Sequence, residues 1–401
     1  MPPPPLRTAC TAVVTPATTL ASSASITSGM VGPISKASSF SGALVLLWVH
    51  HMTGEHNVVS KGCATACGRA GVRHHLGGTM HRFIAGLSLL GLLLFGPMSA
   101  IAAAPTPGDP AGREQDIRGV VHPRNEARRP GGTGNLLYHT GGSVQTGTHH
   151  TYAIYWGSAS SFSQAYQSTI NGFFSAVTAD SGKTTNVYYS DTQYYQVSGT
   201  QTPVTYSEAF VGAWTDTTLP TVNGCSSTAG GPVCVSDTQL QDEITNAIAH
   251  NSSWSTGMGN EFFVFLGDGV STCAGTSCAF SQFCAYHAHY ALNGANVLYA
   301  NMPYTGHNLS ACGTQQYPNG DPAADSTINV TSHEANETVT DPLGNAWYDQ
   351  QGNENGDKCA WNFGAAQGPT GARYNQVING KTYFLQQEWS NHSTGCVQQG
   401  T

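Results

Sequence analysis

The feature that most limits what this chain can fold into is an apolar run at residues 83–95, far inside the sequence. The basic pair His81 and Arg82 precedes the run, and small residues follow it at positions 99–104. This order is typical of a secretory signal, with cleavage expected after Ala102 or Ala104. The run is shorter than the roughly 20 apolar residues of a membrane span. We therefore predict a signal peptide at residues 80–104 and a secreted product without a membrane span.

The regions on either side of this signal differ in composition. Residues 1–79 are rich in Ser, Thr and Ala and show no helical or strand period, so we interpret them as a doubtful or disordered extension, with Met80 as the real start. Residues 105–134 contain Pro, Gly and several arginines, and are predicted to be a linker or a removable pro-segment. We expect one folded domain at residues 135–401, with order beginning near Asn135.

The mature part is strongly acidic. From Ala103 onward the sequence has 9 Lys and Arg and 22 Asp and Glu, a net charge near −13, whereas the whole chain carries −8. A surface of this sign repels nucleic acid and anionic lipid, so neither is expected as a partner. An extracellular protein or peptide substrate is expected instead.

Cysteine usage points to the same compartment. Eight of the 11 cysteines lie downstream of the signal, and an even count in a secreted chain predicts up to four disulfides. A zinc-thiolate site would need close Cys-x-x-Cys pairs, and the mature sequence has none. We prefer the pairings Cys225–Cys234 and Cys359–Cys396, and the sequence leaves the other four cysteines open.

Apolar patterning predicts alternating helices and strands. Buried strands are expected at residues 151–156, 261–266 and 295–300, and helices at residues 161–177 and from an N-cap at Asp237. The Tyr-rich residues 186–197 are predicted to form paired strands. This order favours a mixed α/β (α+β) fold, a single disulfide-stabilised domain with a mixed sheet packed by helices.

One predicted helix carries a metal-binding pattern. It extends from a cap at Asp325-Ser326 to Asp341, because Pro342 disfavours continuation. His333 and Glu337 lie one turn apart and can face one metal ion. Glu334 directly follows the histidine, where the water-activating base lies in the His-Glu-x-x-His helix of zinc hydrolases. Glu replaces the second His here, which should weaken zinc binding.

A third ligand is expected from the loop after this helix. Asp357 and Glu354 are the candidates, and the sequence does not choose between them. Asp341 lies about 12 Å along the helix axis from His333, too far to share its ion, so we expect it to orient His333 or the turn. The alternative is an ordinary helix whose polar side faces water. Against it, six acidic residues crowd within 25 positions: Glu334, Glu337, Asp341, Asp349, Glu354 and Asp357.

The types of ligand favour zinc. One imidazole with two or three carboxylates suits a catalytic zinc site, where three protein ligands leave a place for water. Calcium prefers all-oxygen ligands, so a structural calcium site is the less favoured alternative.

Several other histidines and one tyrosine are weaker candidates for the site. Tyr348, His287 and His392 are candidates for stabilising an oxyanion. His287 and the pair His149-His150 are also alternative ligands. We expect His149 and His150 at a strand edge instead, and His287 near the disulfide-bearing loop.

Several short stretches carry a family resemblance over residues 135–397. They are residues 137–142 (LYHTGG), 152–157 (YAIYWG), 283–287 (FCAYH), 318–321 (PNGD) and 340–345 (TDPLGN). Together they resemble the phosphate-induced protein 1 / EXORDIUM-like family of secreted proteins. The resemblance implies an extracellular or cell-wall location. With its His-Glu-x-x-Glu motif, the chain resembles the bacterial-type branch of this family, in which a zincin-like site is kept. Plant members look to have lost the residues of this motif.

The sequence therefore predicts a secreted zinc metallopeptidase in which Glu334 activates water, with His333, Glu337 and either Asp357 or Glu354 as ligands. The alternative is a non-catalytic, EXORDIUM-like extracellular protein that binds cell-wall glycan or a protein partner. In that case the tyrosines of residues 188–195 would offer a sugar-stacking surface, although a core position is the plainer explanation.

Overall fold

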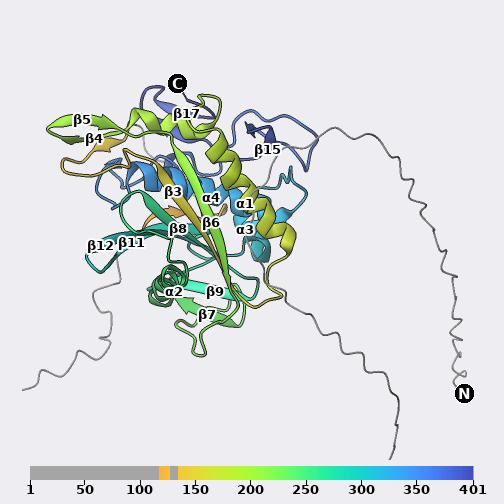
Figure 1. The fold of residues 1–401 in the computed structure, drawn as a ribbon. Helices are drawn as coiled ribbons and strands as arrows, with labels where there is room; N and C mark the ends of the chain where they lie inside the picture. Colours follow the sequence, from red (N-terminus) through yellow and green to blue (C-terminus); the bar gives the residue numbers. More distant parts are fainter. Residues whose placement is uncertain (1–116, 127–133, 401) are drawn as a thin grey trace, which may run out of the picture. The chain divides into compact units, whose positions relative to one another are not determined.

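The computed structural model describes residues 117–126 and 134–400 (Figure 1). The predicted extension, the signal peptide and most of the predicted linker or pro-segment lie outside these residues. None of the helices in the described part is both long and apolar enough to cross a membrane.

A six-stranded mixed sheet forms the centre of the described structure, in the order β1-β11-β12-β8-β3-β6. Strands β12, β8, β3 and β6 run parallel to one another, and β11 and β1 are antiparallel to their neighbours. The strands are β1 (Arg118–Val121), β3 (His149–Trp156), β6 (Glu208–Asp216), β8 (Asn260–Leu266), β11 (Ala285–Leu292) and β12 (Ala295–Met302). The three predicted buried strands are confirmed within β3, β8 and β12, and so is the mixed α/β fold class.

Helices cover both faces of this sheet. The helices are α1 (Gln164–Ala179), α2 (Asp237–His250), α3 (Leu309–Cys312) and α4 (Pro322–Thr340). Helix α1 packs against α4, and α4 also lies against β1, β11 and β12 (Figure 1). In the strand order, the chain moves from β3 outward to β6 through α1, and then back past β3 to β8 through α2. Because both crossovers are expected to be right-handed, the two opposite directions put α1 and α2 on opposite faces of the sheet. Strand β8 is consequently buried on both faces.

Short elements complete the fold. A three-stranded sheet has the order β10-β9-β7, and four two-stranded sheets pair β13 with β2, β4 with β5, β14 with β15, and β16 with β17. The strands are β2 (Leu137–Tyr138), β4 (Tyr195–Ser198), β5 (Thr200–Pro203), β7 (Val233–Ser236), β9 (Val270–Ala274), β10 (Ser277–Cys278), β13 (Trp347–Tyr348), β14 (Gln376–Ile378), β15 (Lys381–Tyr383), β16 (Glu388–Ser390) and β17 (Gly395–Val397). The 3-10 helices are η1 (Val187–Gln193), η2 (Thr305–Asn308) and η3 (Asp357–Cys359).

Order begins earlier than the expected boundary near Asn135, which was wrong. Strand β1 pairs with β11 at the edge of the main sheet, and the carbonyl of Val121 accepts the N–H of Cys284 at 2.6 Å. Part of the segment assigned to a linker or pro-segment is therefore a strand of the sheet. This strand was not predictable from the sequence, because four residues are too few for a strand period to be visible.

The prediction of paired strands at residues 186–197 was also wrong in its first half. The side chain of Asn186 caps η1 by accepting the N–H of Tyr188, and only β4 is extended. Tyr188 and Tyr194 are both buried in the core. Half of the tyrosines in this stretch thus lie inside the protein, away from any sugar-stacking surface.

Four disulfides join the eight mature cysteines. Both preferred pairings, Cys225–Cys234 and Cys359–Cys396, are confirmed. The remaining bonds are Cys273–Cys278 and Cys284–Cys312.

Candidate metal centre

Helix α4 supplies three of the predicted site residues. Its N-cap is Asp321, four residues before the predicted cap at Asp325: the carboxylate of Asp321 accepts the N–H groups of Ala323 and Ala324, each at 3.0 Å, and Pro322 takes the first helical position. The helix ends at Thr340, close to the predicted end. Every residue from 323 to 340 is buried. The alternative of a helix with a solvent-facing polar side is therefore wrong.

His333 and Glu337 meet on this helix as their spacing predicts. The Nε2 atom of His333 lies 2.9 Å from Oε1 of Glu337, and both side chains are fully buried. The side-chain amide of Gln386 contacts Nδ1 of His333 and donates to the carbonyl of Gly356 at 3.2 Å. This contact fixes the ring so that Nε2 faces Glu337.

Asp357 joins this pair from the loop after the helix. Its Oδ1 lies 3.8 Å from Nε2 of His333, and its backbone N–H donates to Oε1 of Glu337 at 2.8 Å. The disulfide at Cys359 fastens the loop two residues further on. Between the two predicted candidates for a third ligand, the structure brings Asp357, not Glu354, to His333.

Glu354 lies beside a histidine that was expected elsewhere. His287, on β11, places Nε2 3.5 Å from Oε2 of Glu354. Its Nδ1 lies 3.1 Å from Oε2 of Glu334 and 3.6 Å from Oε2 of Glu337. The favoured expectation for His287, packing near the disulfide-bearing loop, did not include this contact, in which β11 carries the ring from Cys284 across to the carboxylates of α4. Its alternative role as a metal ligand stays a prediction.

Strand β1 covers this side of the cluster, and it can do so because residue 119 is glycine. A Cβ atom at Gly119 would lie 2.0 Å from Cε1 of His287 and 2.6 Å from Oε2 of Glu337. The backbone there has φ +60°, which glycine adopts readily. The pairing register with β11 shifts at the same point.

Several atoms of the cluster have no hydrogen-bond partner among the described residues. They are Nε2 of His333, Oε1 of Glu334, Oε2 of Glu337 and both carboxylate oxygens of Glu354. All four residues are fully buried. Buried, unpaired polar atoms are costly, so this arrangement calls for a ligand that they share.

Burial and the charges within the cluster shift the pKa values of its own residues. Burial opposes charge on His333, but Glu337, Glu334 and Asp357 outweigh it and raise the pKa of His333 to about 10. Burial likewise disfavours the charged form of Glu337, but His333 and His287 lower its pKa to about 2. Burial raises the pKa of Glu334 to about 7 and, with the charge of Glu337, that of Asp357 to about 8. For Glu354, burial raises the pKa well above its usual value. Burial thus favours the protonated form of Glu334, Asp357 and Glu354, whereas the two histidines keep Glu337 charged.

Other predicted residues take structural positions. Asp341 accepts the N–H groups of Asn345 and Ala346, so it orders the turn, one of its two predicted roles. Of the oxyanion candidates, Tyr348 stacks on His139 with ring centroids 3.5 Å apart, and His392 is exposed.

The expectation that His149 lies at a strand edge was wrong. It begins β3 inside the sheet, fully buried, with Nδ1 2.9 Å from Glu208 and Nε2 2.9 Å from Glu261. Burial opposes its charge, but the two glutamates raise the pKa of His149 to about 10. His150, beside it, lies with Nδ1 3.3 Å from the carbonyl of Gly259.

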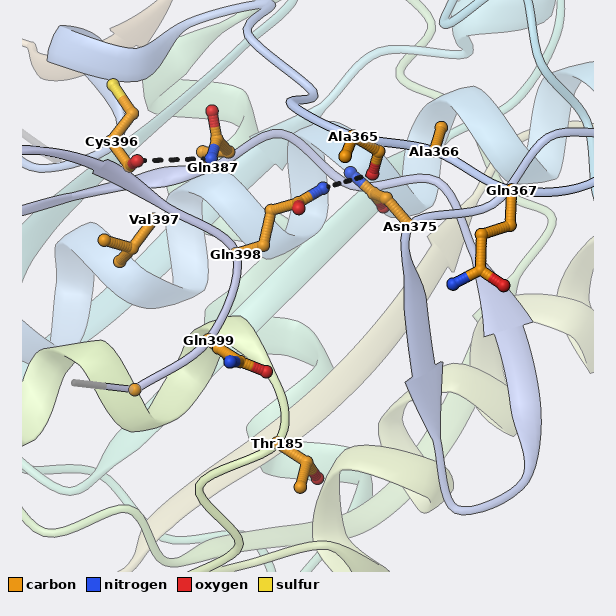
Figure 2. Close-up of a pocket in the computed structure, with 11 residues that line it drawn as sticks. Thr185, Ala365, Ala366, Gln367, Asn375, Gln387, Cys396, Val397, Gln398 and Gln399 are labelled. Atoms are coloured by element: carbon orange, nitrogen blue, oxygen red, sulfur yellow. Dashed lines mark hydrogen bonds between the residues drawn. The ribbon is translucent and has the colours of Figure 1, made fainter.

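A separate cavity of about 580 Å³ lies near the C-terminus, and five of its eleven lining residues are Gln or Asn (Figure 2). The amide of Gln387 donates to the carbonyl of Cys396 at 3.2 Å, and that of Gln398 donates to the carbonyl of Ala365 at 2.7 Å. These hydrogen bonds connect the C-terminal segments to one another. None of the predicted site residues lines this cavity.

No family model matches the chain, and neither the curated proteins nor the solved structures compared with it give a significant match. The resemblance to the EXORDIUM-like family and a zincin-like fold therefore stay predictions.

Proposed function

We propose that the chain is a secreted, metal-dependent hydrolase, a zinc peptidase that uses a glutamate-activated water. The observation that carries this proposal is the convergence of one imidazole and two carboxylates from α4 and the following loop. Nε2 of His333, Oε1 of Glu337 and Oδ1 of Asp357 form a group whose ligand atoms all lie within 4.8 Å of one another. Three protein ligands are the number that a catalytic zinc site uses.

The way His333 and Glu337 face each other also supports a shared ion. Nε2 of His333 and Oε1 of Glu337 lie 2.9 Å apart, and both side chains are fully buried. A single ion bound by both atoms would satisfy them. The nearby second imidazole, His287, further favours zinc over calcium.

Glu334 is suited to handle protons. It follows His333 on α4, it is fully buried, and Nδ1 of His287 holds its Oε2 at 3.1 Å. A zinc ion at the site would polarise a substrate carbonyl and lower the pKa of a water molecule. Glu334 would accept that water's proton and pass it to the leaving group. Among the three proposed ligands, only the side chain of Asp357 reaches solvent at all, with 15% of it exposed, so substrate would approach from its loop.

Secretion fits the same proposal. Four disulfides are expected in an oxidising compartment, and the predicted signal peptide would direct the chain there. The substrate class that we propose is extracellular protein or peptide.

Metal analysis combined with proteolysis tests the proposal. Purified secreted protein should contain zinc and cleave casein. His333→Ala should lose the metal, and Glu334→Gln should keep the metal but lose at least 100-fold in activity, the contribution expected of a general base. Glu243→Gln is a matched control, because Glu243 is a buried glutamate on α2 that accepts from Asn246. Full activity in Glu334→Gln, or metal-free wild-type protein that cleaves equally well, would refute the proposal. Metal-free, inactive and stably folded wild-type protein would favour the binding-protein alternative.

A further inference from the structure

The two carboxylate oxygens of Glu337 face two different histidines. Oε1 lies 2.9 Å from Nε2 of His333 and accepts the N–H of Asp357. Oε2 lies 3.6 Å from Nδ1 of His287, on the side covered by Gly119. Glu337 therefore stands between two groups of possible ligands instead of belonging to one.

The second group consists of His287, Glu337 and Glu354. Their ligand atoms all lie within 4.8 Å of one another, and all three residues are buried. Nε2 of His287 lies 3.5 Å from Oε2 of Glu354, close to the roughly 3.3 Å that separates two donors bound to one zinc ion at about 2.0 Å. One ring nitrogen binds one ion, and Nδ1 already contacts Glu334 at 3.1 Å, so Nε2 is the nitrogen that would bind the second ion. Both oxygens of Glu354 lack a hydrogen-bond partner within the described part of the chain. A buried carboxylate whose charged neighbours are one imidazole and other carboxylates points to a cation that would bind it.

Charge balance favours two ions over one. Glu334, Glu337, Glu354 and Asp357 carry four negative charges when ionised, and they surround the two imidazoles. One divalent ion would leave two of these charges uncompensated in a buried site. Buried Asp341 and Glu388 add further negative charge near His287 and His333. Two divalent ions therefore compensate more of this buried charge than one does, while both histidines stay neutral, which is the form that binds metal.

We propose that this centre holds two divalent transition-metal ions bridged by Glu337, the first bound by His333 and Asp357 and the second by His287 and Glu354. This inference rests on the proposed function for the first ion and adds a second site to it. Paired ions that share a carboxylate typically lie about 3.5–4 Å apart in hydrolases. Glu334, in contact with His287, would lie beside both ions.

Zinc stoichiometry tests the second site. Secreted wild-type protein equilibrated with Zn²⁺ and then freed of loose metal should contain two zinc ions per chain. Glu354→Gln, which preserves side-chain volume, should contain one, whereas the control Glu243→Gln should keep two. One ion per chain in both wild type and Glu354→Gln would overturn the second site and leave the proposed function intact. Two ions in Glu354→Gln would overturn the ligand assignment. No zinc in the wild type would overturn both proposals.

A spectroscopic measurement on the wild type does not depend on a variant folding correctly. Protein loaded with Mn²⁺ alone should show the electron paramagnetic resonance spectrum of an exchange-coupled pair. A spectrum of isolated Mn²⁺ only, at saturating metal, would contradict a carboxylate-bridged centre.

Discussion

Replacing Glu337 by Gln should abolish the increase in the free energy of unfolding that zinc produces in the wild type. A ligand present at 100 times its dissociation constant adds about 2.7 kcal/mol to the free energy of unfolding. For a domain of this size, each kcal/mol raises Tm by roughly 2 °C, so each bound ion should raise Tm by about 5 °C. The carboxylate of Glu337 faces both histidines, so its loss should remove the response to every ion at the centre.

The assay is a thermal unfolding series followed by circular dichroism, first with a chelator and then with increasing Zn²⁺. The zinc-free variant should itself melt below the zinc-free wild type, because removing one partner of a buried ion pair costs about 3–5 kcal/mol. The informative quantity is therefore the rise in Tm with zinc within each protein, not the starting Tm.

Glu243→Gln serves as the control, since burial raises the pKa of Glu243 to about 7 without any histidine contributing to the shift. It should respond to zinc as the wild type does. An equal rise in Tm for Glu337→Gln and wild type would refute the ligand assignment. No rise in the wild type would refute metal binding altogether.

Three further perturbations test the surroundings of the centre. Gly119→Ala adds a Cβ 2.0 Å from His287 at φ +60°, so urea unfolding should detect a loss of about 1–3 kcal/mol, and an unchanged midpoint would contradict the close packing of β1. The pKa of His149 is about 10 in the folded state against 6.5 unfolded, so its stabilisation is complete below pH 6.5 and is lost as the pH rises towards 10, at up to roughly 1.4 kcal/mol per pH unit. Unfolding free energies measured from pH 6 to 9.5 should fall more steeply in the wild type than in His149→Asn, and identical slopes would refute this. Replacing Cys359 and Cys396 by Ser opens a loop with a sequence separation of 37, which should cost about 4 kcal/mol and weaken zinc binding; unaltered zinc affinity would show that the disulfide does not hold the third ligand.

The helix of the site was predictable because its determinants are local. The spacing of His333 and Glu337 fixes their proximity once the chain is helical, and Pro342 limits the helix end. The helix start was less certain because several side chains there can cap. Asp325 was predicted as the cap, but it lies in the first turn and accepts from Asn319 at 2.7 and 3.0 Å, while Asp321 is the cap.

The choice between Asp357 and Glu354 depended on the backbone of a short loop. The N–H of Asp357 donates to Glu337, which brings residue 357 to His333. Glu354, three residues earlier, consequently faces the opposite histidine. Both carboxylates are near the helix in sequence, so spacing alone could not separate these outcomes.

The sequence offered His287 as a ligand, as an oxyanion donor or as a residue packed near the disulfide-bearing loop, and it could not choose among them, because the place of the ring depends on how β11 lies against β1 and α4. The position of His287 also changes the interpretation of Glu337, which stands where a zinc-hydrolase helix has its second histidine. Compared with a His-Glu-x-x-His helix, α4 lacks one imidazole, which by itself should weaken zinc binding. The structure brings an imidazole from the neighbouring strand instead, 3.6 Å from Glu337 and 3.1 Å from Glu334. A carboxylate at position 337 can face two imidazoles with two oxygens, which a histidine there could not do. The Glu that first counted against a working metal site is thus the residue on which a two-ion centre would depend.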